Sequence, residues 1–157
     1  MKALKLASTY ILPYTTVNKI LHDPSSRLLD QFNSVNIHQF DFVVGPHLIF
    51  NNHWLAFIIN MKSRQFFLID PFGIDSHSLK SNFDAWVQYY KLRSDSTIDN
   101  WEVMSTKHPI QQDSYNCRIL TCVFIREIVD KGFITTENYS LNDMRQEMAS
   151  MIVRSSA

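Results

Sequence analysis

Two short apolar segments separated by a polar turn constrain the fold of this chain more than any other feature. The first runs from Trp54 to Ile59 and the second from Gln65 to Asp70, with Asn60–Arg64 between them. Apolar runs of this length on either side of a polar turn are typical of strands rather than helices. The sequence therefore predicts a buried β-hairpin, closed by Pro71.

The residues before the hairpin predict one helical and one extended segment. A helical pattern over residues 16–33 is interrupted at Pro24, which indicates a broken helix that resumes with Leu28 and Leu29. Apolar residues over 38–50 predict a strand that ends at Gly45-Pro46.

The residues after the hairpin predict mainly helices. Apolar spacing indicates an amphipathic helix over 78–91, a third core strand over 101–106 and a buried helix over 117–129. Ser140, followed at the third position by Asp143, predicts the cap of a final helix with an apolar face. Because strands and helices do not alternate regularly, the sequence favours an α+β fold over a doubly wound α/β fold.

Composition and charge limit the possible functions. The chain has 157 residues, only three glycines and five prolines, and no linker-like tract, so we expect a single domain over residues 1–157. The 15 basic and 15 acidic side chains balance, which argues against nucleic acid or a membrane surface as a partner. No segment has the roughly 20 apolar residues that span a bilayer. We expect a monomer in the cytoplasm or nucleus.

The two cysteines, Cys117 and Cys122, lie five positions apart in one predicted helix. At that spacing they point to different sides of the helix, so we expect free thiols in a reducing compartment rather than a disulfide. Two cysteines without a nearby histidine pair do not form a zinc site, and we expect no metal and no cofactor.

Three chemically active side chains stand at the ends of predicted elements. His53 precedes the first hairpin strand, Asp70 ends the second, and Cys117 begins the buried helix. A helix N-terminus stabilises a thiolate, an imidazole can accept the thiol proton, and a carboxylate can orient the imidazole. The loop before Cys117 contains Gln111 and Gln112, and a glutamine amide can donate to an oxyanion.

Each of these residues also has an ordinary interpretation when it is taken alone. A single histidine before a strand is commonly a surface residue, and an aspartate before proline commonly forms a turn. A cysteine in an apolar helix is commonly a small core side chain. Only their order along the chain, and the residues beside them, favour catalysis.

The stretch from His53-Trp54 through Asp70-Pro71 to the segment 109–117, Pro-Ile-Gln-Gln-Asp-Ser-Tyr-Asn-Cys, resembles the Ulp/sentrin-specific protease family. The resemblance covers roughly residues 50–155, and the Gln-Gln-x-Ser-Tyr-x-Cys part is most similar to the NEDD8-specific branch. It implies a papain-like α+β fold with a small antiparallel sheet against helices. It also implies a thiol protease that cleaves at the C-terminal tail of SUMO or NEDD8, with Gln111 in the oxyanion role.

Two positions beside the nucleophile differ from the family pattern. Where the family has Asp before the cysteine and Gly after it, this chain has Asn116 and Arg118. Asn is nearly isosteric with Asp but lacks its charge. Arg118 either obstructs a narrow substrate channel or helps to stabilise the thiolate. We assign both residues to the substrate-binding region.

Trp54 also belongs to the substrate-binding set by resemblance, since the family's Trp beside the histidine can shield the channel; the alternative is a core position. No tryptophan precedes Trp54, so the segment with which the family grips the modifier's tail is not recognisable. Two further functions remain open. One is a catalytically impaired module that binds a ubiquitin-like modifier, and the other is an acyltransferase on the same fold.

Overall fold

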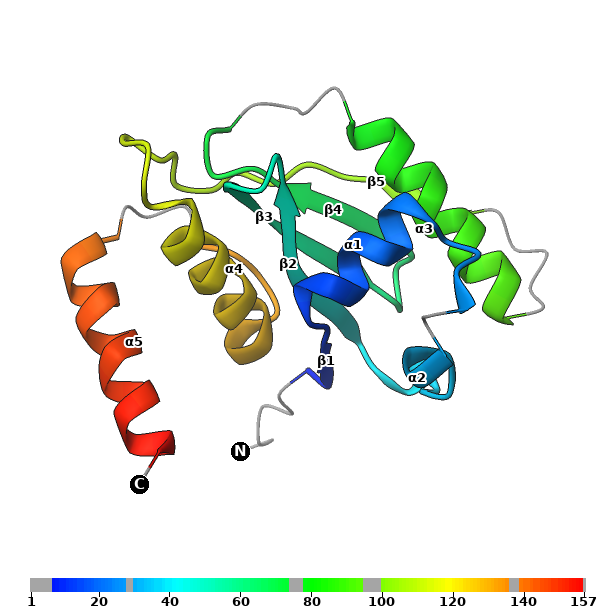
Figure 1. Ribbon diagram of the computed structural model, residues 1–157, viewed down its shortest axis with the longest axis horizontal. Helices are drawn as coiled ribbons and strands as arrows, with labels where there is room; N and C mark the ends of the chain where they lie inside the picture. Colours follow the sequence, from blue (N-terminus) through cyan, green and yellow to red (C-terminus); the bar gives the residue numbers. More distant parts are fainter. Residues whose placement is uncertain (1–6, 28–29, 74–77, 95–99, 136–138, 157) are drawn as a thin grey trace, which may run out of the picture.

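A five-stranded mixed sheet in the order β1-β2-β3-β4-β5 lies at the centre of the computed structural model, which describes residues 7–27, 30–73, 78–94, 100–135 and 139–156 (Figure 1). The strands are β1 (Thr9–Ile11), β2 (Phe42–Ile49), β3 (His53–Asn60), β4 (Gln65–Ile69) and β5 (Glu102–Val103). The three central strands are antiparallel, whereas β1 and β5 run parallel to their neighbours. The α+β prediction is therefore confirmed, although the sheet is antiparallel only in its centre.

Helices cover both faces of this sheet. They are α1 (Tyr14–His22), α2 (Asp30–Asn33), the 3-10 helix η2 (Ile37–Gln39), α3 (Leu79–Ser94), α4 (Cys117–Lys131) and α5 (Leu141–Ser155). Helices α1 and α3 pack against each other on one face, α4 packs on β2 and β3 from the other, and α5 lies against α4 (Figure 1). No helix in the described parts of the chain has the length and apolar content needed to cross a membrane.

The alternation of side chains along β3 divides the core in two. Phe57 and Ile59 join a large aromatic cluster with Trp86 of α3 on the α1/α3 face. Ala56 and Ile58 join a smaller cluster on the α4 face. Because successive strand residues point to opposite faces, the continuous apolar run from Trp54 to Ile59 supplies both clusters at once.

The hairpin and the main helices lie where the sequence predicts them. β3 and β4 form the buried hairpin, and the helix predicted over 16–33 is indeed broken, since Pro24 lies between α1 and α2. Leu28 and Leu29 fall outside the described residues. Ser140 caps α5 by accepting a hydrogen bond from the Asp143 backbone N–H at 3.4 Å. The apolar face predicted for that helix is largely unburied, since Met151 and Ile152 are exposed.

The strand predicted over residues 38–50 was expected to end at Gly45-Pro46, and this is wrong, because β2 continues to Ile49. Pairing between β1 and β2 ends at Val44, so Pro46 lies where β2 has become an edge on that side and its missing N–H is tolerated. Gly45 is needed for packing instead. A Cβ there would lie 2.7 Å from both the Leu12 carbonyl oxygen and a methyl group of Val17.

The strand predicted over 101–106 as part of the core is also wrong in extent. β5 has only two residues, Glu102 and Val103, and both are exposed. Trp101 supplied the apolar signal, since its buried ring packs against Trp86 and Tyr90 at centroid distances of 5.5 and 5.0 Å. A single large anchor beside an edge strand therefore produced the pattern of a longer core strand.

Candidate active site

The hairpin brings His53 and Asp70 together. His53 is the first residue of β3, and Asp70 follows the last residue of β4, which pairs with β3 up to Ile69. The imidazole Nε2 lies 2.8 Å from Asp70 Oδ1, and both side chains are largely buried, at 15% and 11% exposed. Asp70 Oδ1 also accepts the Phe72 backbone N–H at 2.8 Å, so the turn after β4 fixes the carboxylate.

This contact determines which nitrogen of His53 is available for chemistry. A carboxylate only accepts hydrogen bonds, so the Nε2 that faces Asp70 carries the proton and Nδ1 of the neutral ring is left as an acceptor. The Phe72 ring stacks on the imidazole with centroids 4.9 Å apart and an interplanar angle of 26°. Hydrogen bond and stacking together restrict the rotation of the ring.

Cys117 is the first residue of α4, as the sequence predicts, and it is buried. Its Sγ lies 3.9 Å from the carbonyl oxygen of Asn52, the residue before His53. Among the hydrogen bonds of the described residues, the thiol therefore bonds to the backbone beside the histidine rather than to the imidazole. The nucleophile and the base nevertheless lie on adjoining elements, since Asn52 directly precedes His53.

Asn116 connects the nucleophile to two charged side chains. Its Oδ1 accepts a hydrogen bond from Arg145 of α5 at 2.5 Å, and its Nδ2 donates to the Asp113 carboxylate. Asp113 Oδ1 also accepts the backbone N–H groups of Tyr115 at 2.8 Å and Asn116 at 3.0 Å. The Tyr115 N–H and the Asn116 donors hold the pKa of the Asp113 carboxyl below its ordinary value. An amide suits this position, because it can accept from the cation and donate to the anion.

Gln111 is buried in the loop before Cys117, and its backbone N–H donates to the Pro71 carbonyl oxygen at 2.7 Å. This bond ties the loop to the turn that holds Asp70. The Gln111 side-chain amide donates to the Asp113 carbonyl oxygen, and no described group donates to its buried Oε1. To donate to an oxyanion, the Gln111 amide would first have to break its hydrogen bond with the Asp113 carbonyl oxygen. Gln112, by contrast, is exposed.

Arg118 and Trp54 lie together, and they directly follow Cys117 and His53 in the chain. The Arg118 guanidinium carbon is 5.9 Å from the centroid of the Trp54 ring, and Tyr14 packs edge-on against the same ring at 5.4 Å. Trp54 is held from α4 as well, since Thr121 donates to its backbone carbonyl at 3.1 Å. The structure thus brings all seven predicted site residues to one end of the sheet.

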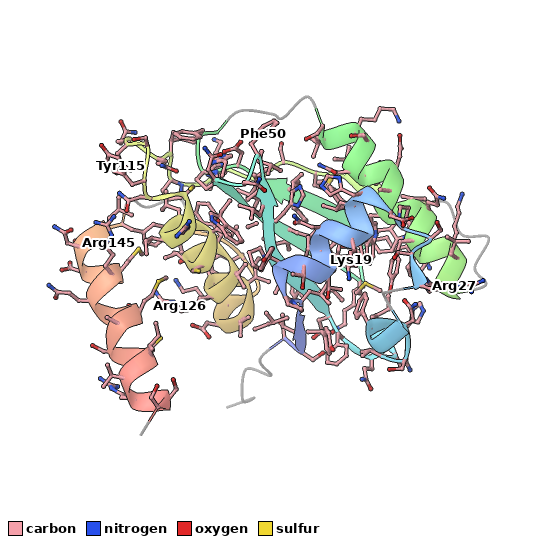
Figure 2. The ribbon with its side chains drawn as sticks, in the orientation of Figure 1. Lys19, Arg27, Phe50, Tyr115, Arg126 and Arg145 are labelled. Carbon is pink, nitrogen blue, oxygen red and sulfur yellow. The ribbon has the colours of Figure 1, made fainter. Side chains whose placement is uncertain are left out.

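Four residues of this region were given no role in the predicted site: Asp113, Arg145, Tyr115 and Phe50. Asp113 lies within the 109–117 motif and Arg145 lies in the final helix that also resembles the family, but the sequence assigned neither a role, because their importance comes from the contact with Asn116. Tyr115 and Phe50 are 76% and 88% exposed, and both lie along the upper edge in Figure 2. Two large aromatic residues flanking Asn52-His53 and Asn116-Cys117 in the sequence would have been a usable signal.

The second cysteine lies apart from this arrangement. Cys122 is a free thiol on the exposed side of α4, where partial burial of its sulfur raises its pKa. Within the described residues, no group of three or more His, Cys, Asp or Glu side chains is placed to hold a metal ion.

The sequence was compared with models of known protein families. Residues 16–156 match the C-terminal catalytic domain of the Ulp1 protease family. No curated protein sequence matches at a significant level.

Solved structures agree on the fold. The SUMO protease Ulp1 superposes with a TM-score of 0.82 at 17% identity, covering 96% of this chain and 71% of that one. The Ulp1-like SUMO protease of Chaetomium thermophilum gives 0.69 at 20% identity, covering 87% of this chain and 56% of that one. The Xanthomonas campestris effector XopD bound to ubiquitin gives 0.63 at 14% identity, covering 90% and 77%. At these identities the structural likeness establishes the fold alone.

Proposed function

This chain belongs to the Ulp1 protease family, a family of cysteine peptidases, and from that premise we propose that it is a thiol protease acting at the C-terminal tail of a ubiquitin-like modifier of the SUMO or NEDD8 class. The reaction is isopeptide cleavage or precursor processing. The observation that carries the proposal is the 2.8 Å contact between His53 and Asp70 beside a cysteine at a helix N-terminus.

The proposed mechanism begins with the transfer of the Cys117 proton to His53 Nδ1. The Asp70 carboxylate stabilises the imidazolium through Nε2, and the N-terminus of α4 stabilises the thiolate. The thiolate attacks the carbonyl carbon of the last residue of the tail, the C–N bond breaks, and His53 returns the proton to the leaving amine. Water, deprotonated by His53, then hydrolyses the thioester and regenerates the thiol.

Gln111 is assigned the role of oxyanion donor in this mechanism. Its amide currently donates to the Asp113 carbonyl oxygen. A short rotation of the amide on substrate binding would exchange one acceptor for another. The loss of one such donor typically reduces the rate about 10²–10³-fold.

The experiment that tests the proposal uses SUMO, NEDD8 and ubiquitin carrying an electrophile at the C-terminus. We expect covalent capture of the wild type by one of them, abolished by Cys117→Ala and His53→Ala. Cys122→Ala is the matched control, because it removes the other thiol of the same helix and should leave capture intact. Capture that persisted in Cys117→Ala would refute the assignment of the nucleophile.

A catalytically impaired binding module is the second candidate. Two observations favour it: the thiol is hydrogen-bonded to the Asn52 carbonyl oxygen, and the Arg118 guanidinium lies against the Trp54 ring one residue from the nucleophile. Under this alternative none of the electrophilic probes would react, while one unmodified modifier would still bind. Isothermal titration with the three modifiers, run beside the capture assay, separates the two functions.

A further inference from the structure

Arg118 is the first residue after the nucleophile, and its guanidinium is held against an aromatic ring. Its central carbon lies 5.9 Å from the Trp54 centroid, and Trp54 directly follows His53. Tyr14 supports the ring edge-on from α1. A guanidinium on an aromatic ring gains from the cation–π contact and loses less conformational freedom when it later binds a ligand.

The charge of Arg118 is not matched inside the described part of the chain. No ion pair forms there between Arg118 and a carboxylate, and its neighbours one turn further along α4 are the uncharged Thr121 and Cys122. Two other arginines of the α4–α5 region are engaged: Arg126 pairs with Glu147 at 3.0 Å, and Arg145 donates to Asn116. Arg118 is exposed and therefore presents a cation to solvent one residue from the nucleophile, with its hydrogen-bond donors unused by these neighbours.

We infer that Arg118 and Trp54 form a carboxylate-binding element beside the nucleophile. The inference rests on the proposed function, because it assigns the carboxylate to the peptide tail that would lie over Cys117. A guanidinium binds a carboxylate through two parallel N–H donors, and this chemistry distinguishes a carboxylate from an amide of the same shape.

The position of Arg118 limits where that carboxylate stands in the tail. Adjacent Cα atoms are about 3.8 Å apart, and an extended peptide advances about 3.3–3.6 Å per residue. A side chain rooted one residue from the nucleophile therefore reaches tail residues within about two or three positions of the scissile bond. The carboxylate belongs either to an acidic side chain there or to the C-terminus of the released tail.

The test measures the binding of fluorescein-labelled tail peptides to the Cys117→Ala protein by fluorescence anisotropy. Three peptides are matched in length: one with Glu near the scissile position and a C-terminal amide, one with Gln there and an amide, and one with Gln and a free C-terminal carboxylate. We expect a carboxylate-bearing peptide to bind about 10–100-fold more tightly than the Gln amide peptide. Preference for the Glu peptide assigns the element to a substrate side chain, and preference for the free acid assigns it to the product.

Variants of Arg118 connect that preference to the residue. In the Cys117→Ala background, Arg118→Gln should abolish the preference and Arg118→Lys should retain part of it. Arg154→Gln, which removes an exposed arginine from the end of α5, is the charge-matched control and should retain all of it. The inference would be overturned if the three peptides bound equally or if none of them bound. It would also be overturned if Arg118→Gln bound every peptide more tightly, because Arg118 would then only obstruct access to the nucleophile.

The outcome is separable from that of the proposed function. If a carboxylate peptide binds through Arg118 while the wild type captures no electrophilic probe, the binding element stands and the protease proposal fails. If a probe is captured while carboxylate and amide peptides bind alike, the protease proposal stands and the carboxylate-binding element fails.

Discussion

Each face of the central sheet carries a tryptophan, and the two residues are used differently. On the α1/α3 face, Trp86 is 0% exposed and packs among Phe57, Tyr89 and Trp101. On the α4 face, Trp54 is only half-buried and has Tyr14 and Arg118 as ring partners. The α1/α3 face is thus closed around its tryptophan, whereas the α4 face has a buried cluster of its own and is open only at the partly exposed Trp54, which follows His53.

The largest expected effect is the difference in stability between alanine variants of these two tryptophans. Trp86→Ala removes a fully buried indole and should lower the free energy of unfolding by about 3–5 kcal/mol. Trp54→Ala should cost less, because its side chain is only partly buried and belongs to neither core cluster, yet it should abolish preferential binding of carboxylate peptides. Urea denaturation of both variants measures the first quantity. Similar losses of stability for the two variants would contradict the contrast between the faces.

The free energy of unfolding should depend on pH through His47, which packs on the α1/α3 face. Burial, with His22 nearby, lowers the pKa of His47 from 6.5 to about 4, and its Nδ1 lies 2.9 Å from Asn18 Oδ1. As the pH falls from 6.5 to about 4, the unfolded chain binds a proton that the folded chain does not. The free energy of unfolding should therefore fall by up to about 3 kcal/mol over this window and change little from this group above it.

Matched variants make that pH effect attributable. His47→Gln should remove this part of the acid dependence in urea titrations at pH 4.5 and 7.5. His38→Gln, which changes an exposed histidine, should leave it in place. A wild-type protein whose stability did not change between these pH values would show that His47 is not buried in its neutral form.

Stability and activity around the nucleophile are expected to depend on the amide of Asn116. Asn116→Asp introduces the residue that the family carries before its cysteine, but here it would place a second carboxylate against Asp113. We expect a loss of stability of about 1–2 kcal/mol and slower probe capture, since like charges repel and a buried donor is lost. The double variant Asn116→Asp/Asp113→Asn should recover most of both. Additive losses in the double-mutant cycle would refute the bridge.

The smallest expected effect is a gain in stability at the turn between β2 and β3. Phe50 and Asn51 both have left-handed backbone, with φ of 50° and 59°, and Asn52 N–H closes the turn on Ile49 O at 3.2 Å. A Phe in this conformation costs about 1–2 kcal/mol, and its 88% exposed ring loses nothing by removal. Phe50→Asn should raise the free energy of unfolding by about 1 kcal/mol in thermal denaturation. A decrease would mean that the ring stabilises the folded state.

The sequence was sufficient for the local parts of this picture. The apolar runs located the hairpin, and element ends located His53, Asp70 and Cys117, because those positions depend on periodicity and turns near in the chain. The path of β2 through Gly45-Pro46 was not predictable, since it depends on Leu12 and Val17 packing against the glycine. The Asp113–Asn116–Arg145 connection was equally hidden, because it joins a loop to a helix 29 residues later.

The contact between His53 and Asp70 has a consequence for the order in which the site assembles during folding. Its two residues are separated by 17 positions across one turn, whereas the contact of Cys117 with Asn52 spans 65. Closing the longer loop costs about 1 kcal/mol more in chain entropy, and such distant contacts tend to form later. The acid–base pair should thus form while the thiol is still remote, so that partly folded chains carry a base without its nucleophile.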